Sequence, residues 1–165
     1  MKTLVIVFSY HHKNTEKIAQ VIAKVLDAPI KKPQQIRPAE LQQYDLIGFG
    51  SGIYGSKHHL TLLMLADSLS QVIDKKTFLF STCGAPAFAV DGGHVNDYIV
   101  KAHSTLKEKL QLKGYTVINE FMCPGFNTNS FLKFFGGINK GRPNAYDLKR
   151  AEEFALNLPQ NIRGS

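Results

Sequence analysis

The chain alternates between runs of apolar residues and segments that repeat apolar residues every three or four positions. Predicted strands, several of them apolar enough for burial on both faces, lie at residues 3–8, 46–49, 77–80 and 115–121. A short additional strand is expected near residues 29–32, where prolines weaken the pattern.

The segments between and after the strands have the period of amphipathic helices. Their apolar positions are Ile18, Val21, Ile22 and Val25; Leu62, Leu65, Ala66 and Leu69; Val95, Ile99, Ala102, Leu106 and Leu110; and Leu148, Ala151, Ala155 and Leu158. Asn144 and Asp147 form a capping pattern before the last helix, and Pro159 is expected at its end.

This alternation predicts an α/β fold in which helices cover both faces of a parallel sheet. Ligands of such sheets bind beyond the carboxyl ends of the strands, so the loops after residues 8, 50, 81 and 121 are the places where chemistry is expected. Residues 124–143 form a long irregular segment that contains "FLKFFGG", and a loop of that length is more often functional than idle.

Composition narrows the class of protein. A chain of 165 residues is long enough for one domain with a real core. The net charge of +7 attracts anions, but the basic residues are spread along the chain, so we expect no nucleic-acid partner. Without an apolar stretch of about 18 residues or a signal-peptide layout, we expect a cytoplasmic protein and no membrane partner. Two cysteines do not make a disulfide scaffold.

The first loop, "SYHHKNT", joins a buried strand to a helix. The start of a helix offers unpaired amides and the positive end of the helix dipole, which favour phosphate, although Asn14 also suits a simple helix cap. No GxxxxGK[ST] motif occurs, which disfavours a P-loop hydrolase. A literal GxGxxG at residues 50–55 follows a strand, but the next strand, "FLFST", ends without the acidic residue that a dinucleotide site needs.

Three loops together resemble those of the flavodoxin family. They are "SYHHKNT", "GSGIYGSKHH" and "STCGAP", each directly after a strand, and "GRPNAYDLKRAEEFALNL" is similar to the family's closing helix. The resemblance implies a three-layer α/β fold with a five-stranded parallel sheet of order 2-1-3-4-5. It implies one domain over residues 1–160, followed by a tail at 161–165.

The resemblance also implies FMN as the cofactor. Residues carried over from the family's first loop for the FMN phosphate are Ser9, His11, His12, Asn14 and Thr15. Those carried over for the flavin ring are Ser51, Gly52, Ile53, Tyr54 and Gly55 from the second loop and Ser81, Thr82, Cys83 and Gly84 from the third. Tyr54 is expected to stack on the ring, while Gly52 and Gly55 let the backbone approach it.

The function implied is that of a flavodoxin, which shuttles single electrons to a redox partner, here one that is acidic at its docking face because this chain is basic. The protein is expected to be a monomer or weak dimer. The alternative is an enzyme, an NAD(P)H-dependent FMN or quinone reductase, in which residues 125–141 cover a nicotinamide pocket and Lys140 and Arg142 meet an anionic cofactor.

Two further features stay open at this point. One is the segment of Lys57, His58 and His59, which either is a solvated helical turn or places a positive charge beside the flavin. Cys83 and Cys123 follow strands expected to be neighbours, so they are either a redox pair or unreactive thiols.

Overall fold

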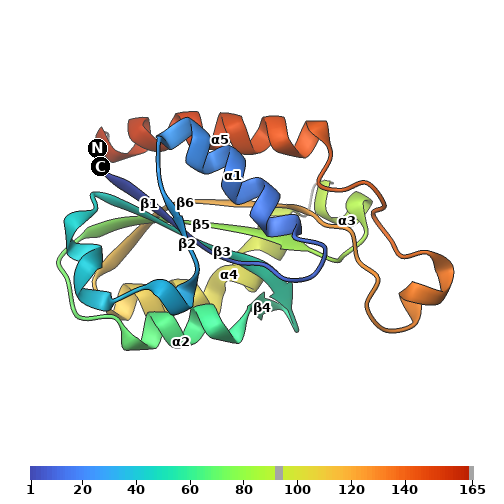
Figure 1. Cartoon of the computed structure of the whole chain (residues 1–165), viewed down its shortest axis with the longest axis horizontal. Helices are drawn as coiled ribbons and strands as arrows, with labels where there is room; N and C mark the ends of the chain where they lie inside the picture. The colour runs from blue at the N-terminus through green and yellow to red at the C-terminus, as the bar shows by residue number, and fades with distance from the viewer. Residues whose placement is uncertain (92–94, 164–165) are drawn as a thin grey trace.

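The computed structural model describes residues 1–91 and 95–163. Its sheet contains five parallel strands, β1 (Thr3–Phe8), β2 (Ile30–Lys31), β3 (Leu46–Tyr54), β5 (Lys75–Cys83) and β6 (Tyr115–Pro124), in the order β2-β1-β3-β5-β6 (Figure 1). When these five parallel strands are numbered in chain order, without β4, their order in the sheet is the expected 2-1-3-4-5. One element was not predicted, the two-residue strand β4 (Lys57–His58), which pairs antiparallel with the end of β3.

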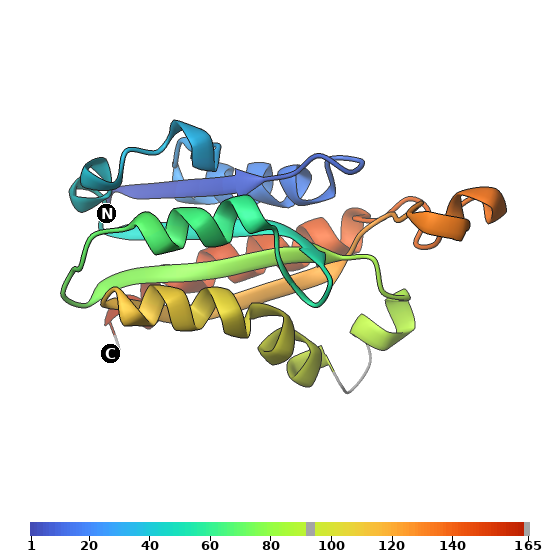
Figure 2. The same ribbon diagram turned by 90° about the horizontal axis from the view of Figure 1, so that it is seen from below.

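Helices cover both faces of the sheet, which confirms the three-layer expectation (Figures 1 and 2). One face carries α1 (Asn14–Leu26) and α5 (Ala145–Arg163), and the other carries α2 (Leu60–Ser68) and α4 (Val95–Leu112). The remaining elements are the short helix α3 (Ala87–Asp91) and the 3₁₀ turns η1 (Pro33–Gln35), η2 (Pro38–Gln43) and η3 (Ser130–Phe135).

Each face of the sheet has its own apolar core. Side chains alternate along a strand, so Phe78 and Phe80 of β5 pack toward α1 and α5, while Leu79 packs toward α2 and α4. Opposite the two phenylalanines, β3 carries Gly48 and Gly50, in register with Phe78 and Phe80. The rings occupy the space that a Cβ at either glycine would need.

The start of α5 is capped as predicted. The Asn144 amide donates to Asp147 Oδ2 at 2.8 Å, and the Asp147 amide donates to Asn144 Oδ1 at 3.2 Å. The expected end at Pro159 is wrong, because α5 continues to Arg163. Proline removes only one amide donor, and Ala155 and Leu158, both fully buried, hold this part of the helix on the sheet. Of the expected tail, residues 161–163 therefore belong to the helix, and residues 164–165 lie outside the described residues.

Residues 125–143 form an extension that we call the arm, which projects from the body beyond the end of β6 (Figures 1 and 2). Its two sides are joined by an antiparallel bridge between Asn127 and Ile138, whose amides and carbonyls exchange bonds of 3.0 and 2.9 Å. The 3₁₀ turn η3 lies at its far end. The arm corresponds to the long irregular segment noted in the sequence, and it contains this bridge and the 3₁₀ turn η3.

Candidate functional site

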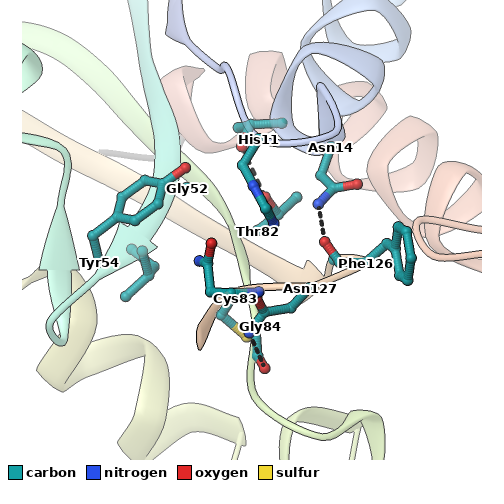
Figure 3. Close-up of a pocket in the computed structure, with 13 residues that line it drawn as sticks. His11, Asn14, Gly52, Tyr54, Thr82, Cys83, Gly84, Phe126 and Asn127 are labelled. Carbon is teal, nitrogen blue, oxygen red and sulfur yellow. Dashed lines mark hydrogen bonds between the residues drawn. The ribbon is translucent and has the colours of Figure 1, made fainter. Parts of the chain in front are cut away.

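A pocket lies where the carboxyl ends of β3, β5 and β6 meet the start of α1, and we call it the candidate site (Figure 3). Its lining residues are His11, Asn14, Thr15, Gly52, Ile53, Tyr54, Thr82, Cys83, Gly84, Gly125, Phe126, Asn127 and Asn129. The three loops singled out in the sequence thus meet in one place, joined by the base of the arm.

The first loop leaves the start of α1 open to an anion. His12 and Lys13 both have positive φ values, 52° and 53°, and no side chain caps the helix. The Lys17 amide bonds to the Lys13 carbonyl at 3.2 Å and opens the helical series. The backbone amides of residues 14–16 consequently have no intrahelical acceptor and are free to bind phosphate or carboxylate oxygens.

Two side chains of the first turn of α1 add polar groups to the site. Asn14 Nδ2 donates to the Phe126 carbonyl at 2.8 Å, as Figure 3 shows, while Asn14 Oδ1 is buried without a hydrogen-bond partner. The Thr15 and Thr82 hydroxyls lie 2.8 Å apart. An orphaned buried acceptor is costly, so Asn14 Oδ1 favours a ligand that carries a hydroxyl or amide donor.

The two histidines of the first loop meet at Thr128 of the arm. Their rings are 4.2 Å apart, and His12 Nε2 lies 2.8 Å from the Thr128 hydroxyl. His11 Nε2 accepts from the Thr128 amide at 3.3 Å, so its proton is on Nδ1 in the neutral ring. Burial, and then the neighbouring His12, lower the pKa of His11. Only His11 of the pair lines the candidate site.

Tyr54 forms a flat wall of the site. Beyond it, Gly55 and Ser56 turn the chain into β4 with φ values of 56° and 63°. The tyrosine ring lies over Gly52, where a Cβ would come within 2.9 Å of it, and it stacks on Tyr10 with 5.5 Å between centroids. Burial, and then the neighbouring phenol of Tyr10, raise the pKa of Tyr54 to about 12, so this wall is an uncharged phenol.

Ser51 and Ser81 were carried over as ring contacts, but the structure places both beneath the site and not on its lining. Their positions are paired across β3 and β5, and both are fully buried. Ser51 Oγ donates to the Gly52 carbonyl at 2.8 Å and lies 2.9 Å from His58 Nδ1. Ser81 Oγ lies 2.8 Å from His103 Nε2. Ser51 therefore supports the Gly52 peptide from behind.

His58 cannot supply the cation considered from the sequence. It is 2% exposed, and burial, together with the neighbouring His103 ring 4.7 Å away, lowers its pKa well below the usual value. His59 is the N-cap of α2, stacks on Phe8 and also has a lowered pKa because of burial. The hypothesis of a positive histidine at position 58 is thus wrong, and the residue is a neutral buried base.

The two cysteines are protonated thiols. Both are free and buried. Burial raises the pKa of Cys83 to about 11 and that of Cys123 well above its usual value. Since the thiolate is the reactive form, neither sulfur is poised as a nucleophile.

The arm supplies the part of the lining that the sequence did not identify: Gly125, Phe126, Asn127 and Asn129. Asn127 Nδ2 donates to the Gly84 carbonyl at 3.2 Å, and Asn127 Oδ1 accepts from the Asn129 amide at 2.8 Å. From the returning side of the arm, Asn139 Nδ2 donates to the carbonyls of Ala85 and Gly125. The sequence pointed to this wall only through the glycine-rich segment at residues 125–141, which the reductase alternative placed over a pocket.

The remaining residues carried over lie near the site without lining it. Ser9 belongs to a separate groove between β1, α1 and β2, and His12 and Gly55 flank the pocket at its loops. Arg142 forms ion pairs with Asp91 and with Asp147, the latter at 2.9 Å, so its charge is already neutralised.

Among residues 1–91 and 95–163, no cluster of three or more potential metal ligands occurs. No helix in these described ranges is long and apolar enough to cross a membrane.

Comparison with known proteins places the chain in a family. A family profile described as a flavodoxin domain matches residues 5–122. An uncharacterized protein of Methanocaldococcus jannaschii is 43% identical over 163 residues, which cover 98% of this chain and 100% of that protein.

Solved structures show the same fold at low sequence identity. Oxidised flavodoxin 2 from Bacillus cereus superposes with a TM-score of 0.67 at 18% identity, over 97% of this chain and 99% of that one. A flavodoxin from the domain Archaea gives a TM-score of 0.62 at 17% identity, over 99% of both chains. The family profile spans well over half of the sequence, so this chain belongs to the flavodoxin family.

Proposed function

We propose that the chain binds FMN in the candidate site and transfers electrons to a redox partner. The observation that carries this proposal is that an open helix start, suited to an anion, and a flat aromatic wall lie in the same pocket. FMN joins a phosphate to a planar ring through a hydroxylated chain, and the pocket offers groups suited to each of these parts.

The phosphate would be held at the start of α1. The amides of residues 14–16 point to this role, because they lack intrahelical acceptors. The Thr15 hydroxyl and the Nδ1 proton of His11 are further donors at the same end of the pocket. Asn14 Oδ1 would accept from a hydroxyl of the ribityl chain, which would satisfy the orphaned buried oxygen.

The flavin ring would lie against Tyr54. FMN supplies the redox chemistry when bound, because its ring accepts and donates electrons one at a time. The protein's contribution is to bury the flavin ring against the neutral phenol of Tyr54, whose own ring fills the space over Gly52. Thr82, Cys83 and Gly84 would border the ring from the next loop.

Electron transfer is favoured over a reaction that needs an acid, base or nucleophile. Among the described residues that line the site there is no carboxylate, the Cys83 thiol stays protonated, and the basic nitrogen of His11, Nε2, already accepts from the Thr128 amide. The net charge of +7 would steer the chain toward a partner that is acidic at its docking face.

The rival proposal is an NAD(P)H-dependent FMN or quinone reductase. It is favoured by the arm, which adds a wall to the site. It is disfavoured by Arg142, whose pairing with two aspartates leaves Lys140 alone of the two residues expected to meet an anionic nicotinamide cofactor. Rapid mixing of the FMN-loaded protein with NADPH distinguishes the two. Fast bleaching of the flavin would support the enzyme, and its absence would support the carrier.

The proposal is tested by adding FMN or riboflavin to the purified protein and recording absorption spectra during dithionite titration. We expect a bound yellow flavin that is reduced in the titration. We also expect much tighter binding of FMN than of riboflavin, because riboflavin lacks the phosphate. A protein that stays colourless with excess FMN would refute the function, and equal affinity for both flavins would refute the role of the α1 start.

Replacing Tyr54 with alanine should weaken FMN binding by roughly tenfold to a hundredfold, through lost stacking and apolar burial. Tyr146 at the start of α5 is 60% exposed and is not among the residues that line the site, so Tyr146→Ala is the matched control and should leave the affinity unchanged. Fluorescence quenching of the flavin measures both. Equal affinities for Tyr54→Ala and the unmodified chain would show that this wall does not hold the ring.

A further inference from the structure

The far end of the arm exposes three phenylalanines within one 3₁₀ turn. Phe131, Phe134 and Phe135 of η3 are 64%, 77% and 81% exposed. Single exposed apolar residues are ordinary, but three aromatic side chains gathered on six residues form a contact surface that water does not favour. We call these three side chains the aromatic tip.

The exposure of the aromatic tip belongs to a folded element. Gly136 ends η3 with a φ of 79°, and the Gly137 amide donates to the Leu132 carbonyl at 2.8 Å. The bridge between Asn127 and Ile138 closes the arm below the turn. These hydrogen bonds hold η3 at the far end of the arm, away from the body (Figure 2).

The segment that carries the tip has only positive formal charges. From residue 121 to residue 146 the sequence contains Lys133, Lys140 and Arg142 and no aspartate or glutamate. Arg142 is paired with aspartates outside this segment, but no ion pair of Lys133 or Lys140 is found in the described part of the chain. Lys133 Nζ instead lies 5.0 Å from the centre of the Phe134 ring. The tip therefore suits an anionic surface.

The shape of the arm decides between kinds of partner. The arm that carries the tip projects from the body, as Figures 1 and 2 show, so a protein partner would need a cavity that receives this projection and its aromatic rings. A lipid bilayer accepts a projecting knob of any shape, because headgroups part around it, and aromatic rings flanked by lysines are favoured at that depth. Phe88 in α3 is also 82% exposed, beside the arm base, where the Ala87 amide bonds to Asn139.

We propose that the aromatic tip docks on the surface of an anionic lipid bilayer, with the three rings among the headgroups and Lys133 and Lys140 near the lipid phosphates. The sequence has no apolar stretch of about 18 residues, and for that reason no membrane partner was expected. Docking on the surface of a bilayer does not require such a stretch. The proposal does not depend on FMN, because the tip lies outside the candidate site.

Docking would also orient the candidate site. Asn127 and Asn129 line that site and lead directly into η3, so the tip and the pocket share one end of the molecule. A bilayer bound at the tip would therefore lie at the same end of the molecule as the candidate site.

The experiment is co-sedimentation of the full chain with phosphatidylcholine vesicles that either contain or lack phosphatidylglycerol. We expect binding to the anionic vesicles, weakened by added salt, and little binding to the neutral ones. Phe134→Ser with Phe135→Ser should lower the partition coefficient by roughly a hundredfold, because each ring contributes about tenfold when buried. Lys133→Gln should lower it about fivefold.

The matched control is Ile73→Ser, which removes an apolar side chain that is 98% exposed outside the arm. It should bind vesicles as the unmodified chain does, and circular dichroism should show that all variants are folded. Failure of the unmodified chain to bind anionic vesicles overturns the proposal. So does unchanged binding of the double phenylalanine variant, or an equal loss in Ile73→Ser. None of these outcomes would affect FMN binding, which the spectra measure separately.

Discussion

Acidification is expected to destabilise the folded chain steeply below about pH 6.5, the ordinary pKa of histidine, because His58 is buried in its neutral form. The folded pKa of His58 lies well below 6.5, whereas in the unfolded chain the residue takes up a proton near that pH. Below pH 6.5 the unfolded state therefore binds one more proton than the folded state. The free energy of unfolding falls with decreasing pH, by about 1.4 kcal/mol per pH unit for this one group.

Urea unfolding at a series of pH values measures this slope. Between pH 6.5 and pH 4.5 the unfolded chain protonates mainly its histidines, because the ordinary pKa of the carboxylates is 4.5 or lower. His11 and His59 also have lowered pKa values and add slopes of the same sign, so the measurement is the difference between the unmodified chain and His58→Asn.

Asparagine places an amide near the position of Nδ1, which keeps a donor for Ser51 and removes the titration. We expect His58→Asn to be less stable at pH 7.5, through altered packing, yet to lose less stability on acidification. Ile73→Ser, at a side chain that is 98% exposed and does not titrate, is the control and should keep the full slope. Equal slopes for His58→Asn and the unmodified chain would contradict the assignment of a neutral buried base.

The order of strands and helices follows from local patterns and could be read from the sequence. Continuous apolar runs mark strands covered on both faces, and apolar repeats mark the helices that cover them. The strand β4 has only two residues, which is too short to show a period. Pro159 misled the prediction because packing of α5 on the sheet outweighs one missing hydrogen bond.

The sequence identified which loops form the candidate site, but not which side chains of those loops face the pocket. Side chains of adjacent residues on a strand point to opposite faces. Ser51 and Ser81 therefore turn toward the face of α4, where they meet His58 and His103, while the next pair in register, Gly52 and Thr82, borders the pocket. The resemblance identified the loops but not this alternation.

The arm wall depends on contacts that no local pattern encodes. Asn127 reaches Gly84 across 43 positions of sequence, and Asn139 reaches Ala85 across 54. A glycine-rich segment indicates irregular backbone, but it does not say which strand end that backbone will border.

Gly50→Ala is expected to be among the most destabilising single substitutions in the sheet, although it adds one methyl group. Gly50 lies opposite Phe80 in the ladder between β3 and β5, and the Phe80 ring occupies the space where the new Cβ would stand. Phe80 is fully buried and cannot swing into solvent. Overpacking of this kind costs about 1–3 kcal/mol, and more where neither side can yield.

Phe80→Leu tests whether the Phe80 ring is the cause. Alone it should destabilise the chain by about 1 kcal/mol, through the cavity that it leaves. Combined with Gly50→Ala it should cost less than the sum of the two single changes, because the smaller side chain makes room for the methyl group. Thermal and urea unfolding of the four chains give the coupling directly, and strict additivity would show that the cost of Gly50→Ala arises elsewhere. Gly50 directly precedes Ser51, which supports the Gly52 peptide at the edge of the candidate site. A strained strand at Gly50 should therefore disturb the site as well, so we expect the four chains to rank in FMN affinity as they rank in stability.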